Sequence, residues 1–284
     1  MADSAKGTKL RSTKPDLASI LGIVVAFGAI AAGLLMEKGS PSDVMQVSAA
    51  VIVLGGTLGA CMITAPLSSL IAAAKGLKSV FLQEVIHTDV AIEEVIRYAT
   101  KARKSSVISL EEDLPGISDP FLRKALTLAV DGTDIQELRQ MMELELTMKE
   151  KHAEAAAKVF ESAGGYSPTV GIIGAVLGLI QVMKHLEDIS EVGRGIAVAF
   201  VATVYGVAVA NLFFLPAAAK LKSRIHDEVE ANELMLTGVG SILEGMNPKL
   251  IRVKLEAFLH DKGKKKTKGE AEGAGAAQAA AAGD

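Results

Sequence analysis

The amino-acid sequence predicts an all-α membrane protein with four transmembrane helices and a large helical cytoplasmic loop between the second and the third. Half of the 284 residues are apolar but only 4% are aromatic, a composition that favours lipid-facing helices over a large soluble core. Four long stretches contain no charged side chain. The segment 75–163, which is dense in Glu, Lys and Arg, separates the second of these stretches from the third.

The first uncharged stretch, residues 17–36, is long enough to cross a hydrocarbon layer of ~30 Å, because an α-helix rises ~1.5 Å per residue. Four cations precede it, so a cleaved signal peptide is the alternative. The apolar part is too long for a typical signal sequence, and no small-x-small cleavage site follows it. We therefore expect a retained membrane span.

The other three uncharged stretches are residues 44–74, 169–183 and 195–219. The second and the fourth reach the length that a span requires. The third reaches it only if the helix begins near Gly164, ahead of Pro168. The sequence therefore predicts a proline inside the third membrane helix.

The orientation follows from lysine and arginine near the ends of the spans. The amino terminus carries four of them, and the chain after the fourth span opens with three more. The two short connections hold only Lys38, Lys184 and Arg194. Because cytoplasmic loops carry the excess of Lys and Arg, both termini and the long middle segment are predicted to be cytoplasmic.

Within the middle segment, apolar residues recur at helical spacing. Breaks are expected at residues 104–106, 114–120 and 131–134, which leaves three or four helices. The last helix is expected to run without interruption from about Asp134 into the third span. After the fourth span, the helix should continue, break near the sequence GMNP and resume as one more short helix.

The predicted organisation follows from these patterns. In chain order it comprises a cytoplasmic amino terminus (1–15), transmembrane helices one and two (16–74), a cytoplasmic helical loop (75–163), transmembrane helices three and four (164–219), cytoplasmic carboxy-terminal helices (220–262) and a low-complexity tail predicted to be disordered (263–284).

No carboxylate or amine lies well inside any predicted span, and the polar side chains at depth are hydroxyls and amides such as those of Thr203, Tyr205 and Asn211. Proton or cation conduction normally requires a titratable or coordinating group within the membrane. If this chain moves ions, another chain must supply that group. The net charge of −3 gives no indication of nucleic-acid binding. The histidines are scattered and no catalytic motif occurs, so neither an enzyme nor a metal or cofactor site is expected.

Small residues and prolines mark the third and fourth spans. Gly171, Gly174 and Gly178 repeat at spacings of three and four, which lets helix backbones approach closely in lipid. They can serve packing within the chain, contact with a partner helix, or both. Pro168 and Pro216 are either passive kinks or a hinge that bends a cytoplasmic extension.

Five stretches of the sequence resemble a known family. They are DLASILGIVVAFGAIAAG in the first span, VIVLGGTLGA in the second, KARKSSVISLEE in the loop, GGYSPTVGIIGAVLGLI in the third span and VATVYGVAVANLFFLPAAAKL in the fourth. Together they are similar to the A subunit of the bacterial flagellar stator, the MotA/PomA group, and the likeness extends from Asp16 to about Leu259.

The resemblance implies an ion-driven motor subunit of the bacterial inner membrane. In that family several A subunits, arranged as a pentamer, surround two single-span MotB-type subunits whose aspartate carries the ion. The cytoplasmic loop pushes on the rotor protein FliG. By their place in the motifs, Arg103, Lys104 and Glu111 correspond to charges used against the rotor, and Pro168 and Pro216 to prolines needed for coupling.

The resemblance also bears on the ion and on the partner helix. Sodium-driven relatives carry threonine where this chain has Ala175, and a hydroxyl can coordinate a hard cation whereas a methyl group cannot. This chain keeps Thr203, but it has Ala202 beside it, where sodium-driven relatives tend to have a second threonine. We therefore expect protons rather than sodium ions to pass near Ala175, Thr203 and Tyr205. Gly171, Gly174 and Gly178 are expected to leave room for the partner's helix.

The ExbB/TolQ energisers are the alternative reading. They also convert ion flow into work, but they have three spans, and their large loop follows the first. The first span of this chain and the charged stretch from Arg103 to Glu111 argue against that assignment.

Overall fold

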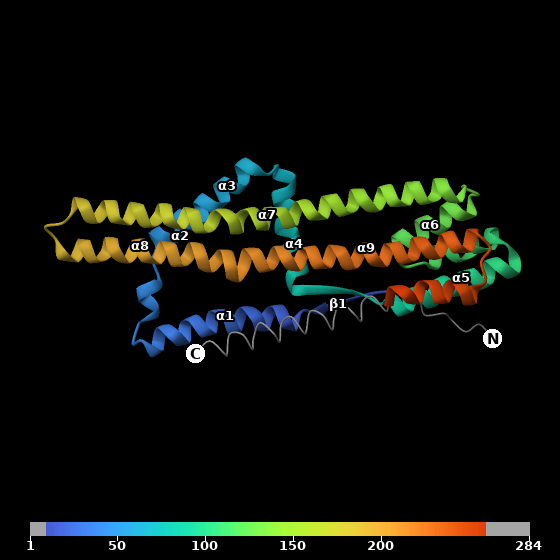
Figure 1. Ribbon diagram of the computed structural model, residues 1–284, viewed down its shortest axis with the longest axis horizontal. Helices are drawn as coiled ribbons and strands as arrows, with labels where there is room; N and C mark the ends of the chain where they lie inside the picture. Colours follow the sequence, from blue (N-terminus) through green and yellow to red (C-terminus); the bar gives the residue numbers. More distant parts are fainter. Residues whose placement is uncertain (1–9, 260–284) are drawn as a thin grey trace. The chain divides into compact units, whose positions relative to one another are not determined.

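The computed structural model describes residues 10–259. Most of the predicted amino-terminal segment and the whole predicted disordered tail, 263–284, lie outside the described residues. Within them, helices dominate, and four helices are long and apolar enough to cross a membrane. The predicted fold class, an all-α protein with four membrane helices and a large helical region between the second and third, is confirmed (Figure 1).

The chain forms two compact units, and it passes between them four times. The first takes its described residues from Met1–Ser12, Glu84–Met148 and His226–Asp284. The second comprises Thr13–Gln83 and Lys149–Ile225. It contains the uncharged stretches of all four apolar helices. We call them the loop unit and the membrane unit.

The first two membrane helices differ in their regularity. Helix α1, Leu17–Met36, is an uninterrupted α-helix capped by Asp16, whose carboxylate accepts a hydrogen bond from the Ser19 backbone N–H at 3.1 Å. The second span opens with the 3-10 turn η1, Pro41–Val44. Its helical body then divides into three consecutive elements: α2 (Val47–Ala50), the π-helical turn η2 (Val51–Gly55) and α3 (Gly56–Thr64).

The second span ends earlier than the sequence predicted. Ala65 adopts an extended backbone, with φ −121° and ψ 141°, and α4, Leu67–Phe81, begins as a separate helix after Pro66. A proline disfavours the helical conformation in the residue before it, which explains the break at Ala65. The expectation of one apolar span from 44 to 74 is therefore wrong at its carboxyl end.

The third and fourth spans are parts of longer helices. Helix α7, Ile135–Lys184, is one helix of 50 residues, which confirms the expectation that the last loop helix continues into the third span. A turn at 185–188 leads to α8, Ile189–Val209, whose amino terminus is capped by the Asp188 carboxylate. The π-helical turn η4, Ala210–Phe214, then joins α8 to α9, Leu215–Leu243.

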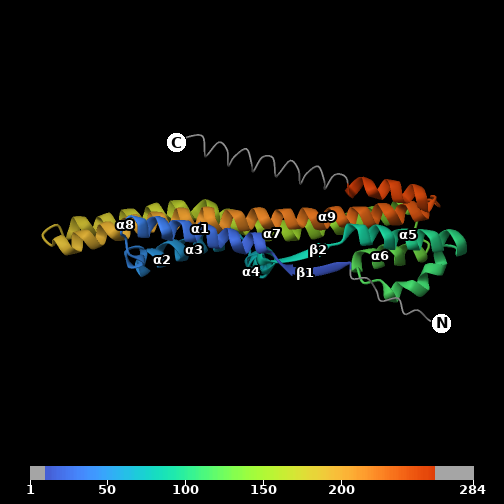
Figure 2. The same ribbon diagram turned by 90° about the horizontal axis from the view of Figure 1, so that it is seen from below.

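Two short strands were not expected. Strand β1, Arg11–Pro15, pairs with β2, Leu82–Ile86, in a two-stranded sheet (Figure 2). Backbone hydrogen bonds lie at either end, from the Asp16 N–H to the Phe81 carbonyl at 2.8 Å and from the His87 N–H to the Leu10 carbonyl at 3.1 Å. Neither strand shows an alternation of apolar and polar residues, so the sequence contains no strand signal at these positions.

The loop unit is built from helices that pack on α7 and α9. They are α5 (Thr88–Ser105), the 3-10 segment η3 (Val107–Gly116), α6 (Pro120–Val130) and a helix over residues 248–259. The breaks between them fall where the sequence predicted breaks. The carboxy-terminal interruption also agrees: α9 ends at Leu243, Gly245 has a φ of +68°, and Asn247 caps the next helix through its side chain.

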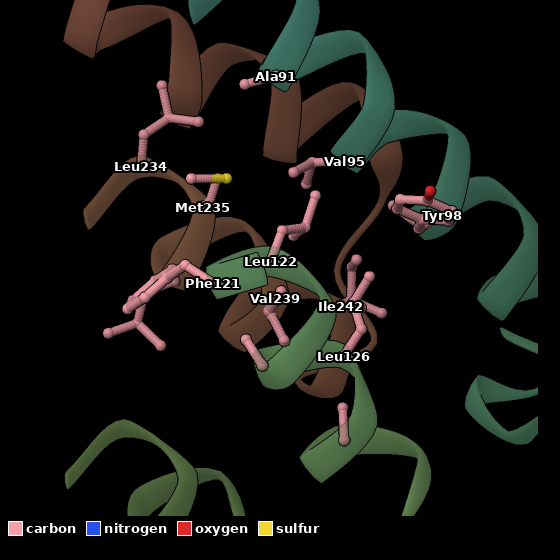
Figure 3. Packing of buried hydrophobic residues seen from close by; sticks show 14 of the residues in the cluster. Ala91, Val95, Tyr98, Phe121, Leu122, Leu126, Leu234, Met235, Val239 and Ile242 are labelled. Atoms are coloured by element: carbon pink, nitrogen blue, oxygen red, sulfur yellow. The ribbon is translucent and has the colours of Figure 1, made fainter. Parts of the chain in front are cut away.

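The loop unit has a continuous apolar core. In Figure 3, Val95 on α5 and Leu122 on α6 face Met235 and Val239 on α9, and all four are fully buried. Burying one such side chain stabilises a fold by about 1.5–3 kcal/mol. Gly238 allows the close contact between α5 and α9, because a Cβ there would lie 2.6 Å from Val95 Cγ1. The loop unit therefore has a buried apolar core of the kind that soluble domains have.

The membrane unit has a much smaller core. No residue of α1 is buried, although the helix is strongly apolar. One small cluster joins α4, α7 and α9 around Ala157, and another joins the second span to α8 around Ala202. Apolar side chains that are exposed in a single chain of this kind are those that lipid or neighbouring subunits cover.

Candidate functional site

Three glycines of α7 lie against α8 of the same chain. A Cβ added to Gly171 would lie 2.9 Å from the Ala202 carbonyl oxygen, and one added to Gly178 would lie 2.8 Å from both the Ala199 N and the Gly195 carbonyl oxygen. Since backbone atoms cannot move aside as a flexible side chain can, only glycine fits at Gly178. The close approach of the two helices therefore depends on these glycines, as small-residue packing in lipid predicts.

Gly174 lies at the point where three spans meet. A Cβ there would be 2.8 Å from Ala202 Cβ on α8 and 3.4 Å from Ile52 Cγ2 in the second span. The next residue, Ala175, is half-buried. The structure thus shows an intramolecular role for Gly171, Gly174 and Gly178. Contact of these glycines with a partner's helix stays a prediction.

The two hydroxyl side chains predicted to lie near the ion path have different surroundings. Thr203 on α8 is half-buried, and its hydroxyl donates to the Ala199 carbonyl at 3.3 Å. The Tyr205 hydroxyl donates to the Val44 carbonyl at 2.5 Å and accepts a weaker hydrogen bond from the Gln46 N–H at 3.4 Å. Tyr205 therefore ties the beginning of the second span to α8. A place for Tyr205 in an ion path stays a prediction.

Pro216 directly follows the π-helical turn η4. The ring of a proline collides with the carbonyl four residues earlier, here that of Leu212, and the proline has no N–H to donate to it. In η4 the Leu215 N–H donates to the Ala210 carbonyl, five residues back, so the helix widens before Pro216. The widened turn accommodates the ring without ending the helix.

Pro168 lies within α7 without interrupting it. It faces α8, where a Cβ on Gly206 would lie 2.6 Å from the Ser167 carbonyl oxygen and 3.3 Å from Pro168 Cα. One helical turn earlier on α7, Gly164 packs against Leu215, the residue before Pro216: a Cβ added to Gly164 would lie 2.6 Å from Leu215 Cδ2. Leu215, the neighbour of Pro216, therefore contacts α7 about one turn, or ~6 Å, before Pro168. Their role in coupling stays a prediction.

The three charges predicted to face the rotor are on the surface of the loop unit. Arg103 and Lys104 lie in the last turn of α5, and Glu111 lies in η3. All three are exposed, and none has an ion pair or side-chain hydrogen bond among residues 10–259. These charges are therefore available to another molecule.

The turn between these charges has an unusual backbone. Ser106 has a φ of +82° and a ψ of 156°, a region that is almost restricted to glycine. Its N–H donates to the Ala102 carbonyl at 2.9 Å, and its carbonyl accepts a hydrogen bond from the Ser109 hydroxyl at 2.6 Å. The segment between Lys104 and Glu111 is thus held by local hydrogen bonds.

A neighbouring ion pair adds to the rigidity of this surface. Lys101 Nζ lies 2.8 Å from an Asp113 carboxylate oxygen, which joins α5 to η3. This hydrogen bond raises the pKa of Lys101, so the side chain stays protonated throughout the physiological range. Sequence spacing alone could not identify the pair, because its two members lie on different elements.

An ion cluster at the start of α1 was also missed. The Asp16 carboxylate is buried and pairs with Lys220 at 2.6 Å and with Arg224, both on α9. Burial raises the pKa of Asp16, but hydrogen bonds from Lys220 and Ser19 and the charges of Lys220 and Arg224 outweigh it and lower the pKa overall. A helix-capping aspartate can be read from the sequence. Its partners, more than 200 residues away, cannot.

Within the described range, no group of three or more His, Cys, Asp or Glu side chains could hold a metal ion.

Comparison with known proteins places these features in a family. A sequence model of the MotA/TolQ/ExbB proton channel family matches residues 114–234, and one named Motility protein A N-terminal matches residues 20–103. Motility protein A of Bacillus subtilis (strain 168) is 36% identical over 248 residues, which cover 86% of this chain and 91% of the relative.

Two solved structures are similar over nearly the same length. The C. jejuni MotAB structure matches with a TM-score of 0.82 and 33% identity, covering 86% of this chain and 95% of the matched one. The flagellar MotAB stator complex from Bacillus subtilis matches with a TM-score of 0.80 and 34% identity, covering 89% and 99%.

Proposed function

The chain belongs to the motility protein A family, and on that premise we propose that it is the A subunit of a flagellar stator, in which ion flow across the inner membrane drives torque on the rotor. The resemblance found in the sequence motifs is thereby confirmed, and this reading is favoured over an ExbB/TolQ-type energiser. The protein is a multi-pass membrane protein and a component of an ion channel rather than an enzyme.

A partner subunit carries the ion in this proposal. The uncharged core of every span leaves no carboxylate or amine at depth in this chain. Because ion conduction through a membrane normally requires such a group, a MotB-type single-span subunit supplies it. The two matched structures are MotAB assemblies, which supports a complex of this chain with such a partner. A pentamer of the chain around two partner subunits is the arrangement that we propose.

The rotor protein FliG is the proposed target of Arg103, Lys104 and Glu111. These side chains are exposed and have no ionic partner within residues 10–259, on a surface stiffened by the Lys101–Asp113 pair. Exposed charges of both signs orient partners and accelerate association more than they tighten binding. A motor that steps must engage and release quickly, so such a surface suits it.

In the proposed orientation, both termini and the loop unit are cytoplasmic. The support for this orientation is the excess of Lys and Arg in the amino terminus and after the fourth span. Protons are the proposed ion. Ala175 has a methyl group where a sodium path needs an oxygen ligand, and the Thr203 hydroxyl already donates to the Ala199 carbonyl.

Ion flux into proteoliposomes tests the proposed function. We expect the chain purified with its partner to pass protons down a pH gradient, and the chain alone to pass none, because it has no carboxylate or amine at depth. Flux should be unchanged when potassium replaces sodium. Conduction by the chain alone would contradict the proposed division of labour, and flux that follows the sodium concentration would contradict the proposed ion.

A further inference from the structure

A groove of about 330 Å³ lies in the membrane unit, between the first turns of α1, the end of α4 and the region around η4. Helix α1 contributes one stripe at helical spacing, formed by Ser19, Gly22, Ile23 and Ala26. Phe81 at the end of α4 and Phe213 and Pro216 near η4 form the other walls. The lining is thus largely apolar.

The mouth of this groove is positively charged. Lys220 lines the groove, and its Nζ lies 2.6 Å from the Asp16 carboxylate, which also pairs with Arg224. Two cations share one carboxylate, so one positive charge is left over. An ammonium group has three N–H donors, and the bond to Asp16 is the one hydrogen bond that Lys220 makes within residues 10–259. The mouth can therefore bind an anion.

The depth of the groove corresponds to one leaflet of a bilayer. Asp16 marks the polar beginning of α1, and Ala26, the deepest α1 residue of the lining, lies nine residues beyond Leu17. At ~1.5 Å per residue this is about 14 Å, close to half of a ~30 Å hydrocarbon layer. An apolar groove of this length with a cationic mouth matches the length of one acyl chain and the polarity of an anionic phospholipid.

We propose that this groove is a specific site for an anionic glycerophospholipid of the leaflet that adjoins Asp16. The phosphate lies near Lys220 and Arg224, and one acyl chain lies along the α1 stripe towards Ala26. The lipid fills the groove beside the direct contacts that α1 makes with η4 and α4, and its phosphate adds to the Asp16 ion cluster that joins α1 to α9.

Photolabelling tests the site directly. The purified complex with its partner is placed in vesicles that contain phosphatidylglycerol with a photoreactive acyl chain, and labelled peptides are mapped by mass spectrometry. Peptides containing the α1 stripe and η4 should carry at least several-fold more label than the exposed apolar side of α8. The assay does not depend on ion conduction or rotation, so it is independent of the proposed function.

The glycines of α1 offer a matched pair of variants. A Cβ on Gly22 meets no atom within 4 Å, so Gly22→Phe can extend into the groove without a backbone collision. Gly28 is equally open, but it is six residues further on and lies outside the lining. Gly22→Phe should lower labelling of the groove at least five-fold, whereas Gly28→Phe should leave it unchanged.

The headgroup preference provides a second readout, which does not depend on a variant that fills the groove with a bulky side chain. One basic residue near a membrane surface favours an anionic lipid by about 1 kcal/mol, or about five-fold. Labelling by phosphatidylglycerol should exceed labelling by phosphatidylcholine by about that factor. Lys220→Gln keeps a hydrogen-bond donor for Asp16 but removes the surplus charge, and should abolish the preference.

Three outcomes would overturn the proposal. They are labelling of the groove no greater than that of the α8 surface, labelling unaffected by Gly22→Phe, and equal labelling by the two headgroups in the unmodified complex. Cross-links from the α1 stripe to a second copy of the chain in place of lipid would also overturn it, because the groove would then be a subunit contact. If Gly22→Phe prevents assembly, the headgroup ratio and its response to Lys220→Gln decide.

Discussion

At the scale of single residues, the structure separates two kinds of position. The charges at Arg103, Lys104 and Glu111 are exposed and unpaired among the described residues, so they contribute little to the stability of the chain. The glycines at Gly171 and Gly178 allow α7 and α8 to come into contact, so they contribute mainly to packing. Substitution at the two kinds of position should therefore affect different properties.

Reversal of the charges that we propose face the rotor should lower torque and leave the complex assembled. We expect Arg103→Glu and Glu111→Lys to reduce the rotation speed of tethered cells under load by at least half. Exposed charges at the edge of an interface control how fast and in which orientation two proteins associate. The amount of complex that copurifies with the partner should not change. Lys249→Glu and Glu233→Lys are matched controls on exposed charges of the same unit. Normal rotation in the double reversal would refute the assignment.

Gly178→Ala should destabilise the membrane unit. The added Cβ would lie 2.8 Å from two backbone atoms of α8, so the helices must separate. Overpacking of this kind costs about 1–3 kcal/mol. The unfolding temperature of the purified complex should fall by several degrees. Gly193→Ala on α8 has no atom within 4 Å of its Cβ and should leave it unchanged or slightly raised. Equal effects of the two substitutions would count against the proposed packing.

At the scale of elements, the start of α1 is tied to two other helices. The Asp16 N–H donates to the Phe81 carbonyl at the end of α4, and its carboxylate pairs with Lys220 and Arg224 on α9. Helix α1 buries none of its own side chains in the chain, so this cluster is its main polar attachment. Lys220, one of its cations, lies four residues beyond Pro216 and thus close in sequence to the widened turn η4.

Asp16→Asn should release this attachment in a pH-dependent manner. Leaving the paired cations without their carboxylate costs about 3 kcal/mol. The folded-state pKa of Asp16 is lowered, so its stabilisation is fully present above the unfolded-state pKa of ~3.9 and is lost as the pH falls through the lower folded value. The difference in unfolding temperature between the native protein and Asp16→Asn should be constant from pH 5 to 8 and shrink below pH 4.

A second capping aspartate provides the control for this experiment. Asp188 caps α8 in the same way, but it is exposed and has no ion pair with a second helix within residues 10–259. Asparagine is as good a cap as aspartate, so Asp188→Asn should change the unfolding temperature much less. An Asp16→Asn variant as stable as the native protein at pH 7 would show that the cluster does not secure α1.

At the scale of the whole molecule, the proposed ion path and the proposed rotor surface belong to different units. Ala175, Thr203 and both prolines are in the membrane unit, whereas Arg103 and Glu111 are in the loop unit. The chain passes between the units four times, twice within the long helices α7 and α9. Any motion that couples the two sites must therefore pass through these helices or through the paired strands.

The energy available for such a motion is small. One elementary charge that moves through 100 mV releases about 2.3 kcal/mol. This is comparable to the burial of one aliphatic side chain, so it can shift a weakly held helix but cannot unfold the core of the loop unit. The sparse packing of the membrane unit, in which α1 buries no side chain, is compatible with steps of this size.

The sequence by itself determined the local properties of the chain. Uncharged length predicted four spans, periodic apolar residues predicted the loop helices, and motifs identified the family and the exposed charges at Arg103 and Glu111. These properties depend on neighbouring residues in the chain, so they can be read in order along it. The missed end of the second span at Thr64 also has a local cause, since Pro66 was visible in the sequence.

Only the tertiary structure decided which distant residues meet. It showed that Gly178 contacts α8 of its own chain, that Asp16 pairs with Lys220 and Arg224, and that two short segments without apolar–polar alternation pair as strands. A close contact or an ion pair between residues far apart in the chain depends on how whole helices pack. Residue type and spacing indicate which interactions a side chain can make, whereas the packing of the helices decides which partner it meets.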